Sequence, residues 1–289
     1  MPAKAMSRHE LSRRFDMQEA RGSGMQRLGV IGGTGLINMT VGDEMKQSGL
    51  TLVRRDDVTV ETPWGVVPLT CMRLQADDEE KELFFLQRHH NGGQASKPPH
   101  MIEHRANIRA LADAGCEAIM AVCSVGAIAS DFPPGKVALA HQYIDFTGVA
   151  STFHDDSAVF TSVTEPFDSS VNSRLSSVLR SVQDFSDEER LFYTYWLAQG
   201  PHFETKSEID AIDTLGGHMV GMTMPREAKL ARELNLPYAA VCISSNWAAG
   251  REPGDAGADL DHHSVSSQAN RRLKPVWAVS YYTSPSPRD

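Results

Sequence analysis

Residues 28–36 read Leu28-Gly29-Val30-Ile31-Gly32-Gly33-Thr34-Gly35-Leu36, an apolar run typical of a buried strand followed directly by a turn rich in glycine. Glycine lets the backbone turn sharply and approach a ligand without interference from a Cβ atom. Successive N–H groups and the hydroxyl of Thr34 suit an oxyanion. The pattern therefore predicts a site for phosphate or a phosphate-bearing ligand, although a glycine-rich turn after a strand also occurs as plain packing.

The composition is that of an ordinary globular protein with an excess of acidic residues. The chain has 289 residues, of which 41% are hydrophobic, enough for a full core in one large α/β domain or two small ones. The formal net charge of -9 argues against a nucleic-acid partner. No apolar run in the sequence approaches the roughly 20 residues that a membrane-spanning helix needs.

The cysteines indicate the cellular compartment of the protein, and the two ends of the chain indicate where its folded domain begins and ends. No CxxC pair exists, and each cysteine lies in or beside an apolar run, which favours buried thiols in a reducing cytoplasm. Residues 1–27 lack the apolar stretch of a secretory signal, so we expect a disordered extension, with a transit peptide as the alternative. We expect residues 28–275 to form the domain, and the tail 276–289 to be disordered or non-native. The cysteines are Cys71, Cys116, Cys123 and Cys242.

Strand-like runs alternate with helical stretches along the rest of the chain. We expect strands at 51–60, 66–74, 83–86, 118–122, 137–140 and 237–243, helices at 100–114, 171–183, 206–215 and 225–235, and a long surface loop at 150–170. Buried strands that alternate with helices favour an α/β fold with a mostly parallel sheet covered on both faces. Ligands bind such sheets at the carboxyl ends of the strands. Polar residues gather at those ends, namely Thr34, Arg88, His89, Ser124 and Asn246.

Arg88 and His89 follow a short buried strand and point to anion binding. Arginine offers a planar, permanently charged fork that matches a phosphate, and the histidine could donate a second hydrogen bond. The alternative is a surface Arg-His pair. Metal binding is disfavoured because no carboxylate stands at ligand spacing from the histidines. The sequence also lacks a GxSxG elbow, GxGxxG spacing and a P-loop lysine, so neither a serine nucleophile nor a dinucleotide cofactor is indicated.

Two further segments carry candidate binding residues. Phe203 and Glu204 come just before an expected helix, where the ring could stack on a flat heterocycle and the carboxylate could accept from a ring N–H. The alternative for this pair is a helix cap with a core phenylalanine. Thr223 stands at the start of another expected helix, which is a further position suited to an anion.

An ordered set of motifs resembles the trimeric purine nucleoside phosphorylase and methylthioadenosine phosphorylase family. The resemblance runs from about residue 28 to residue 250. The segments His141–Asp145 and Asn246–Gly250 look most like those of the bacterial S-methyl-5'-thioinosine phosphorylases. The motifs are Gly32–Gly35, Glu61–Gly65, Arg88-His89, Pro98–His100 with Arg105–Asn107, His141–Thr147, Gly200–Thr205, Gly221–Thr223 and Asn246–Gly250.

The resemblance implies a fold, an assembly and a reaction. The implied fold is a single α/β domain with a central mixed, partly barrel-like sheet flanked by helices, and the implied assembly is a homotrimer in the cytoplasm. The implied reaction is reversible phosphorolysis, which needs inorganic phosphate as a co-substrate and no cofactor. By position, the resemblance assigns phosphate to Thr34, Arg88, His89, Ser124 and Thr223, the ribose to Met222, and the purine to Phe203, Glu204 and Asn246, with Asn246 and His89 as the catalytic pair.

Asn246 bears on which base would be cleaved. An asparagine can donate to a 6-oxo group, whereas an ionised aspartate can only accept and suits a 6-amino group. The amide therefore favours 6-oxopurines. Within that class, the resemblance implies S-methyl-5'-thioinosine as the nucleoside, giving hypoxanthine and 5-methylthioribose 1-phosphate. Inosine, guanosine or methylthioadenosine phosphorylase activity is the alternative. Other classes that remain open are a nucleoside hydrolase, a weakly active purine-binding protein and a nicotinamide-dependent oxidoreductase.

Three departures from the family pattern fall close to these motifs. The segment 90–97 is about two residues longer than in the family and lacks its second histidine. His202 replaces the usual arginine, and residues 224–227 carry a rearranged form of the usual Gly-Met-Pro-Glu. These departures bear on the level of activity and on the 5' preference more than on the fold.

Overall fold

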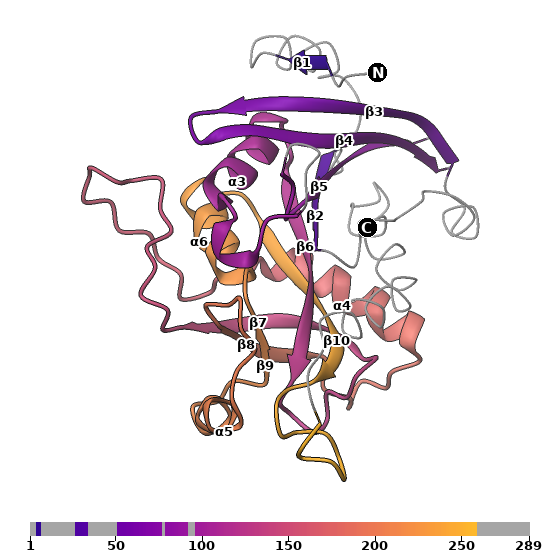
Figure 1. The fold of residues 1–289 in the computed structure, drawn as a ribbon. Coiled ribbons are helices and arrows are strands. Elements are labelled where there is room, and N and C mark those ends of the chain that lie inside the picture. The colour runs from indigo at the N-terminus through magenta and orange to yellow at the C-terminus, as the bar shows by residue number, and fades with distance from the viewer. Residues whose placement is uncertain (1–3, 7–26, 34–50, 77–78, 92–95, 259–289) are drawn as a thin grey trace.

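A mixed sheet of ten strands forms the centre of the part of the chain that the computed structural model describes, residues 4–6, 27–33, 51–76, 79–91 and 96–258 (Figure 1). Across the sheet the order is β1-β3-β4-β5-β2-β6-β10-β7-β8-β9. The strands are β1 (Lys4–Met6), β2 (Arg27–Gly32), β3 (Thr51–Thr62), β4 (Gly65–Ala76), β5 (Glu79–Gln87), β6 (Ala118–Ala127), β7 (Val137–Asp145), β8 (Phe192–Leu197), β9 (Met219–Gly221) and β10 (Tyr238–Trp247).

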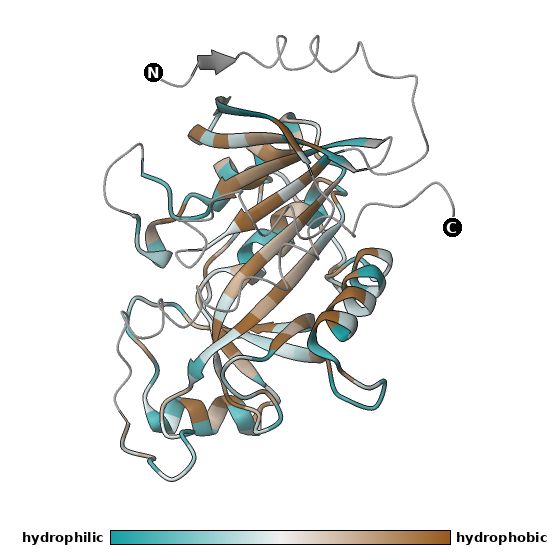
Figure 2. Cartoon of the chain, turned by 90° about the vertical axis from the view of Figure 1, so that its right-hand side faces the viewer, coloured by the Kyte–Doolittle hydropathy of each residue, from teal (hydrophilic) through white to brown (hydrophobic). Residues whose placement is uncertain are grey.

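The strands β5, β2, β6 and β10 form a parallel core in the middle of the sheet. Their side chains are apolar on both faces, as in Val30, Ile31 and Met120, none of which is exposed. Such continuous apolar runs are expected where helices cover both faces of parallel strands. Figure 2 shows these central strands as mostly hydrophobic. The prediction of buried parallel strands is confirmed for this part of the sheet.

Five strands close into a ring at one end of the sheet. β6 pairs with β10 on one side and with β9 on the other. β10 continues through antiparallel β7 to the parallel strands β8 and β9. The sheet is therefore mixed and partly barrel-like, which confirms the architecture that the family resemblance implied. Six of the ten strand pairings among the described residues are parallel, so the expectation of a mostly parallel sheet also holds.

A long antiparallel hairpin of β3 and β4 extends the other end of the sheet. Its turn is closed by Thr62, whose hydroxyl donates to the Gly65 carbonyl over 2.7 Å. Gly65 has a φ of 133°, a conformation that favours glycine. β1 pairs with β3 in parallel, so three residues of the range expected to be a disordered extension take part in the sheet.

Four α-helices flank the sheet within the described residues: α3 (His104–Asp113), α4 (Ser169–Gln183), α5 (Lys206–Thr214) and α6 (Met224–Glu233). Figure 1 shows α3 and α6 on one side of the central strands and α4 on the other. Each of α4 and α5 begins at a side-chain cap, Asp168 and Thr205, and the latter forms a capping box with Glu208. No helix among the described residues is long and apolar enough to cross a membrane.

The structure differs from the sequence-based expectations at two elements. The helix expected from residue 100 begins only at His104, because Pro98 and Pro99 start a separate 3-10 turn and the Glu103 side chain caps the helix that follows. The strand β8 was not predicted. It alternates half-buried with buried residues, and its inward side chains include Tyr193 and Tyr195.

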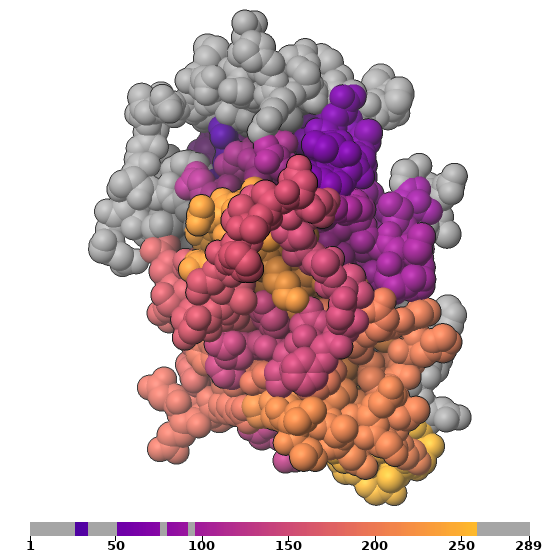
Figure 3. All heavy atoms as spheres, turned by 90° about the vertical axis from the view of Figure 1, so that its left-hand side faces the viewer, coloured from indigo at the N-terminus to yellow at the C-terminus, as the bar shows by residue number. Residues whose placement is uncertain are grey.

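The irregular segment 146–168 runs between β7 and α4, which agrees with the expected loop at 150–170. Figure 3 shows this segment arching over α6. Two hydrogen bonds join them, from the Phe153 N–H to Glu233 and from Arg232 to the Ser162 carbonyl.

Candidate functional site

A cavity of about 410 Å³ opens where several strands of the sheet end. Its walls come from the residues that follow β2, β5, β8 and β9 and from the last residues of β6 and β10. Eight of the nine site residues expected from the sequence line this one cavity: Arg88, His89, Ser124, Phe203, Glu204, Met222, Thr223 and Asn246. The ninth, Thr34, lies outside the described residues, and its neighbour Gly33 lines the cavity.

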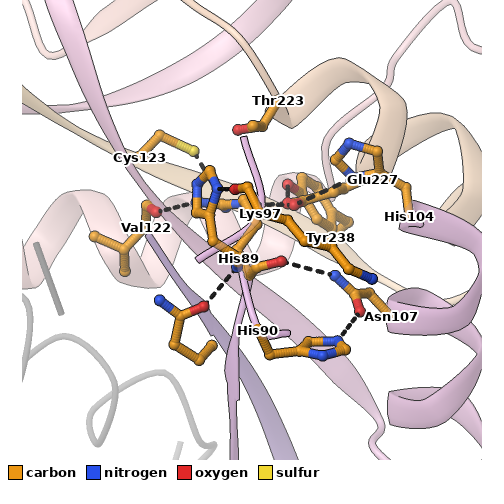
Figure 4. A network of polar contacts seen from close by, with 12 residues as sticks. His89, His90, Lys97, His104, Asn107, Val122, Cys123, Thr223, Glu227 and Tyr238 are labelled. Atoms are coloured by element: carbon orange, nitrogen blue, oxygen red, sulfur yellow. Dashed lines mark hydrogen bonds and ion pairs between the residues drawn. The ribbon is translucent and has the colours of Figure 1, made fainter. Parts of the chain in front are cut away.

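Arg88 lies at the innermost end of the cavity and is only 2% exposed. Its Nε and Nη2 donate to the two carboxylate oxygens of Glu227 over 2.5 and 3.1 Å. Its Nη1 donates to the Val122 carbonyl over 2.9 Å, and its Nη2 also contacts the Cys123 Sγ over 3.5 Å. Figure 4 shows Val122, Cys123 and Glu227 around this network. Arg88 is thus a fixed group and not a flexible surface side chain.

The sequence analysis did not identify Glu227, Cys123 or Lys97 as part of this region. Glu227 is fully buried and Cys123 is 2% exposed, and both contact Arg88. Lys97 lines the cavity and holds His89 through its backbone. Glu227 was visible only as part of the rearranged segment 224–227, and no local pattern linked it to Arg88, which is 139 residues away.

His89 is held by one hydrogen bond from its ring and one from its backbone N–H. Its Nδ1 donates to the Lys97 carbonyl over 2.8 Å, and its own N–H donates to the Gln87 side chain over 2.5 Å. Burial lowers the pKa of His89 to about 4, which outweighs the hydrogen bond to Lys97. The imidazole is therefore neutral near pH 7, with Nδ1 protonated and Nε2 free to accept.

The neighbouring residue His90 faces away from the cavity and supports the same turn. Its Nε2 donates to Asn107 over 2.8 Å, and the Asn107 amide donates to the Arg88 carbonyl over 3.2 Å. The two adjacent histidines thus point to different partners. Among the residues that the structure describes, no group of three His, Cys, Asp or Glu side chains could hold a metal ion.

Two hydroxyl groups complete the end of the cavity near Arg88. Thr223 is the N-cap residue of α6, and its hydroxyl makes no capping hydrogen bond to the helix. Its backbone N–H donates to the Tyr195 hydroxyl over 3.5 Å. Ser124 projects from β6 into the cavity and is exposed there. Together with Arg88, these groups form a part of the cavity that is rich in hydrogen-bond donors, and the His89 Nε2 adds an acceptor there.

The lining of the cavity also combines an aromatic ring with a carboxylate and an amide. Phe203 is 38% exposed, so its ring has a face without protein packing. Glu204 is half-buried, and its Oε1 has no hydrogen-bond partner among the described residues. Burial raises the pKa of Glu204. A partly buried carboxylate with an unused oxygen is suited to accept an N–H from a ligand.

Asn246 comes from β10 and has a fixed orientation. Its Nδ2 donates to the Trp247 carbonyl over 2.7 Å, and its Oδ1 accepts from the Ser245 hydroxyl over 2.8 Å. One N–H of Nδ2 and one lone pair of Oδ1 remain for a ligand. Met222 also lines the cavity, and its Sδ would lie 2.7 Å from a Cβ on Gly200. The arrangement can hold a ligand with an anion at one end and a flat, hydrogen-bonding ring at the other.

Comparison with known proteins gives a consistent result. Residues 54–278 match the family described as "Phosphorylase superfamily". A probable S-methyl-5'-thioinosine phosphorylase of Methanopyrus kandleri is 38% identical over 228 residues, which cover 78% of this chain and 80% of that protein. The 6-oxopurine nucleoside phosphorylase of Pyrococcus furiosus is 35% identical over 265 residues, covering 87% and 89% of the two chains.

The fold is also shared with solved structures. The crystal structure of a methylthioadenosine phosphorylase from an antarctic soil metagenomic library superposes with a TM-score of 0.70 at 26% identity. That superposition covers 88% of this chain and 84% of the other. The family match, the two relatives and the shared fold agree with the cavity at the strand ends, and the chain belongs to the phosphorylase superfamily.

Proposed function

We propose that this protein is a pentosyltransferase that cleaves S-methyl-5'-thioinosine with phosphate, giving hypoxanthine and 5-methylthioribose 1-phosphate for purine salvage. The observation that carries the proposal is that one cavity is lined both by the hydrogen-bond donors around Arg88 and by Phe203, Glu204 and Asn246, which suit a purine base. The Methanopyrus kandleri relative, named as a probable S-methyl-5'-thioinosine phosphorylase, supports the choice of nucleoside.

The donor-rich end is proposed to hold phosphate. Arg88, Ser124 and Thr223 would donate to its oxygens, and Thr34 would add a further hydroxyl. The unprotonated Nε2 of His89 would accept from the O–H that the phosphate still carries. Phosphate held beneath C1' stabilises the positive charge that develops on the ribose as the glycosidic bond breaks. The C1'–N9 bond breaks, a C1'–O bond to phosphate forms, and the electron pair of the broken bond stays on the purine.

The other end is proposed to hold the base and the sugar. Phe203 would stack on the purine, Met222 would lie under the ribose, and Glu204 would accept a ring N–H. Asn246 would bond N7 as the departing purine gains a proton there, and would donate to a 6-oxo group. Placement of these groups supplies the rate enhancement, so the proposal requires neither a covalent intermediate nor a cofactor.

A second substrate class within the same chemistry is inosine or guanosine. The Pyrococcus furiosus relative is named a 6-oxopurine nucleoside phosphorylase, and it covers more of this chain than the Methanopyrus relative does. Methylthioadenosine is the third nucleoside, since the solved structure with a TM-score of 0.70 carries that name. The Asn246 amide favours a 6-oxo group over a 6-amino group, which places methylthioadenosine behind the other two.

We further propose that the protein is a cytoplasmic homotrimer. The segment 146–168 carries Phe160, which is 94% exposed, and Phe146, which is 73% exposed. Exposed apolar side chains of this size are typical of a surface that packs against another chain. The four free cysteines agree with a reducing compartment. Light scattering coupled to size exclusion tests the assembly, and a mass of one chain would contradict it.

The experiment that tests the function measures free base released from methylthioinosine, inosine and methylthioadenosine, each with and without phosphate. Phosphate-dependent release of hypoxanthine, fastest from methylthioinosine, is the expected result. Release without phosphate would indicate a hydrolase. Tight binding of hypoxanthine without turnover of any nucleoside would indicate a purine-binding protein, and preferred release of adenine would overturn the base assignment.

A further inference from the structure

The contacts of Arg88 leave little of its guanidinium free. Arginine has five N–H donors, and within the part of the chain that the structure describes four of them are used by Glu227, Val122 and Cys123. The remaining donor is on Nη1. That nitrogen would lie 3.2 Å from a Cβ on Gly33, so it sits against the glycine turn that lines the cavity. The two hydrogen bonds from Arg88 to Glu227 therefore set the direction of this remaining N–H donor.

Glu227 does not itself reach the cavity. It is fully buried, and its contacts are with Arg88, with the Tyr238 hydroxyl, which donates to Oε2 over 2.9 Å, and with His104, whose Nδ1 lies 3.7 Å from Oε1. Burial alone would raise the pKa of Glu227, but the charge and hydrogen bonds of Arg88 outweigh it and lower the pKa to about 2. The carboxylate is thus ionised near pH 7.

This buried pair ties three parts of the fold together. Glu227 belongs to the first turn of α6, four residues after Thr223, while Arg88 follows β5 and Tyr238 begins β10. A bidentate arginine–carboxylate pair fixes both the direction and the distance of the guanidinium. The same helix turn thereby sets the positions of Arg88 and Thr223, the two sides of the donor-rich end.

We propose that Glu227 is a positioning residue for phosphate, and that Tyr238 holds Glu227 in place for this task. The inference rests on the proposed function, because it assigns phosphate to the Arg88 end of the cavity. Since Glu227 neutralises the Arg88 charge, phosphate is bound mainly by directed N–H and O–H donors and not by an unpaired cation. Affinity for phosphate should therefore depend strongly on the geometry that Glu227 imposes.

The test is the variant Glu227→Gln, measured with both substrates varied. Glutamine keeps the size of the side chain but places an NH₂ group against the Arg88 donors and removes the counter-charge. We expect KM for phosphate to rise about tenfold or more, because charge-assisted hydrogen bonds are the strong ones. KM for the nucleoside should change by no more than about twofold, since no base-end residue contacts Glu227.

Three further variants separate positioning from a general loss of structure. Glu227→Asp keeps the charge and should recover part of the phosphate affinity. Tyr238→Phe removes only the bond to Glu227 and should raise KM for phosphate about two- to threefold. Glu233→Gln is the matched control, since it changes a carboxylate at the other end of α6 that accepts from the Phe153 N–H and does not line the cavity. It should leave KM for phosphate at the wild-type value.

A binding measurement that needs no turnover completes the test. Inorganic phosphate should raise the Tm of the wild-type protein, and this rise should be smaller in Glu227→Gln and unchanged in Glu233→Gln. If the wild type cleaves no nucleoside but still shows the Tm rise, the proposed function fails and this comparison still tests the role of Glu227. Equal phosphate KM and equal Tm rise in the wild type and in Glu227→Gln would overturn the inference. If Glu227→Gln does not fold, the other two variants decide. A wild-type KM for phosphate and a wild-type Tm rise in both Glu227→Asp and Tyr238→Phe would overturn the inference.

Discussion

Asn246 in β10 pairs with Gly126 in β6, one residue out of the register that the two strands keep from Tyr238 to Ser244. The extra residue is Ser245, whose hydroxyl donates to Asn246 Oδ1 over 2.8 Å. A Cβ on Gly126 would lie 3.5 Å from Asn246 Nδ2. Bulges of this kind re-aim side chains at the ends of strands. Here the bulge at Ser245, and the lack of a side chain on Gly126, let the Asn246 amide face the cavity in a fixed orientation.

Asn246→Asp should reverse the preference for the base. The aspartate would place an oxygen about 2.7 Å from the Trp247 carbonyl, where Asn246 Nδ2 now donates. It could no longer donate to a 6-oxo group, and a lost donor of this kind reduces kcat/KM by about 100-fold or more. We expect the ratio of kcat/KM for methylthioinosine to that for methylthioadenosine to fall accordingly, as measured by base release.

The matched control for that change is Asn235→Asp, at an exposed asparagine that follows α6. It adds the same charge far from the cavity and should keep the wild-type ratio. A 6-oxo preference that persists in Asn246→Asp would show that another group reads the base.

Glu204→Gln should make the protein more stable at pH 8 while making it a poorer enzyme. Burial raises the pKa of Glu204 above its usual value of 4.5, so ionisation of this carboxyl destabilises the fold. The stability that the protonated form provides is fully present below pH 4.5 and is lost as the pH rises through the raised pKa. Urea midpoints at pH 4 and pH 8 should therefore differ less in the variant than in the wild type.

The same variant should lower kcat/KM about tenfold, because a neutral acceptor replaces a charged one opposite the base N–H. Glu208→Gln provides the contrast. The Thr205 N–H and hydroxyl both donate to the Glu208 carboxylate and lower its pKa, so this variant should lose stability at pH 8 and keep its kcat/KM. Equal urea midpoints of Glu204→Gln and the wild type at pH 8 would contradict the assignment.

Much of the site could be predicted because parallel strands bring distant residues to one edge. The apolar runs before Arg88, Ser124 and Asn246 identify three buried strands, and their carboxyl ends meet in the structure as β5, β6 and β10. The fold class followed from the same runs. The closed ring of five strands could not be predicted from these runs. β6 pairs with β9 through only two residue pairs, and no local pattern encodes that contact. The family resemblance, and not periodicity, indicated the barrel.

The strand β8 was missed although its residues carried a signal. Four of the six residues from Phe192 to Leu197 are aromatic, and aromatic residues favour a strand. Glu227 carried no such signal. Its role depends on α6 placing it against Arg88 in the tertiary structure, and a carboxylate on one face of a helix looks the same whether it is solvated or fully buried. Pairs of this kind become visible only when the packing of the helix is known.

His89→Asn should reduce the dependence of stability on pH between about 6.5 and 4. The unfolded chain takes up a proton near the usual histidine value of 6.5, whereas burial holds the pKa of folded His89 at about 4. The unfolded state thus binds more protons in this range, and stability falls as the pH falls. Asparagine does not titrate, but its amide can still donate to the Lys97 carbonyl.

The measurement is the change in urea midpoint from pH 7 to pH 4.5, compared between the wild type and His89→Asn. It should be smaller in His89→Asn, while the contributions of other groups to the slope cancel in the difference. The variant should also raise KM for phosphate, because the imidazole Nε2 is lost. An unchanged slope would mean that folded His89 titrates near 6.5.

Gly221→Ala should disturb the phosphate end through Tyr195. A Cβ on Gly221 would lie 2.1 Å from the Tyr195 hydroxyl, which accepts from the Thr223 N–H. Tyr195 is fully buried in effect, at 1% exposure, so it cannot move aside without disturbing the core. Overpacking of this kind typically costs about 1–3 kcal/mol, and displacement of Thr223 should raise KM for phosphate.

Gly216→Ala separates the two effects. Gly216 has a φ of 89° and open space around it, so alanine there should cost about 1 kcal/mol through backbone strain alone. We expect both variants to unfold at lower urea than the wild type, but only Gly221→Ala to weaken phosphate binding. If both variants change KM for phosphate equally, the effect follows general destabilisation, and the contact between Tyr195 and Thr223 has no special role in the site.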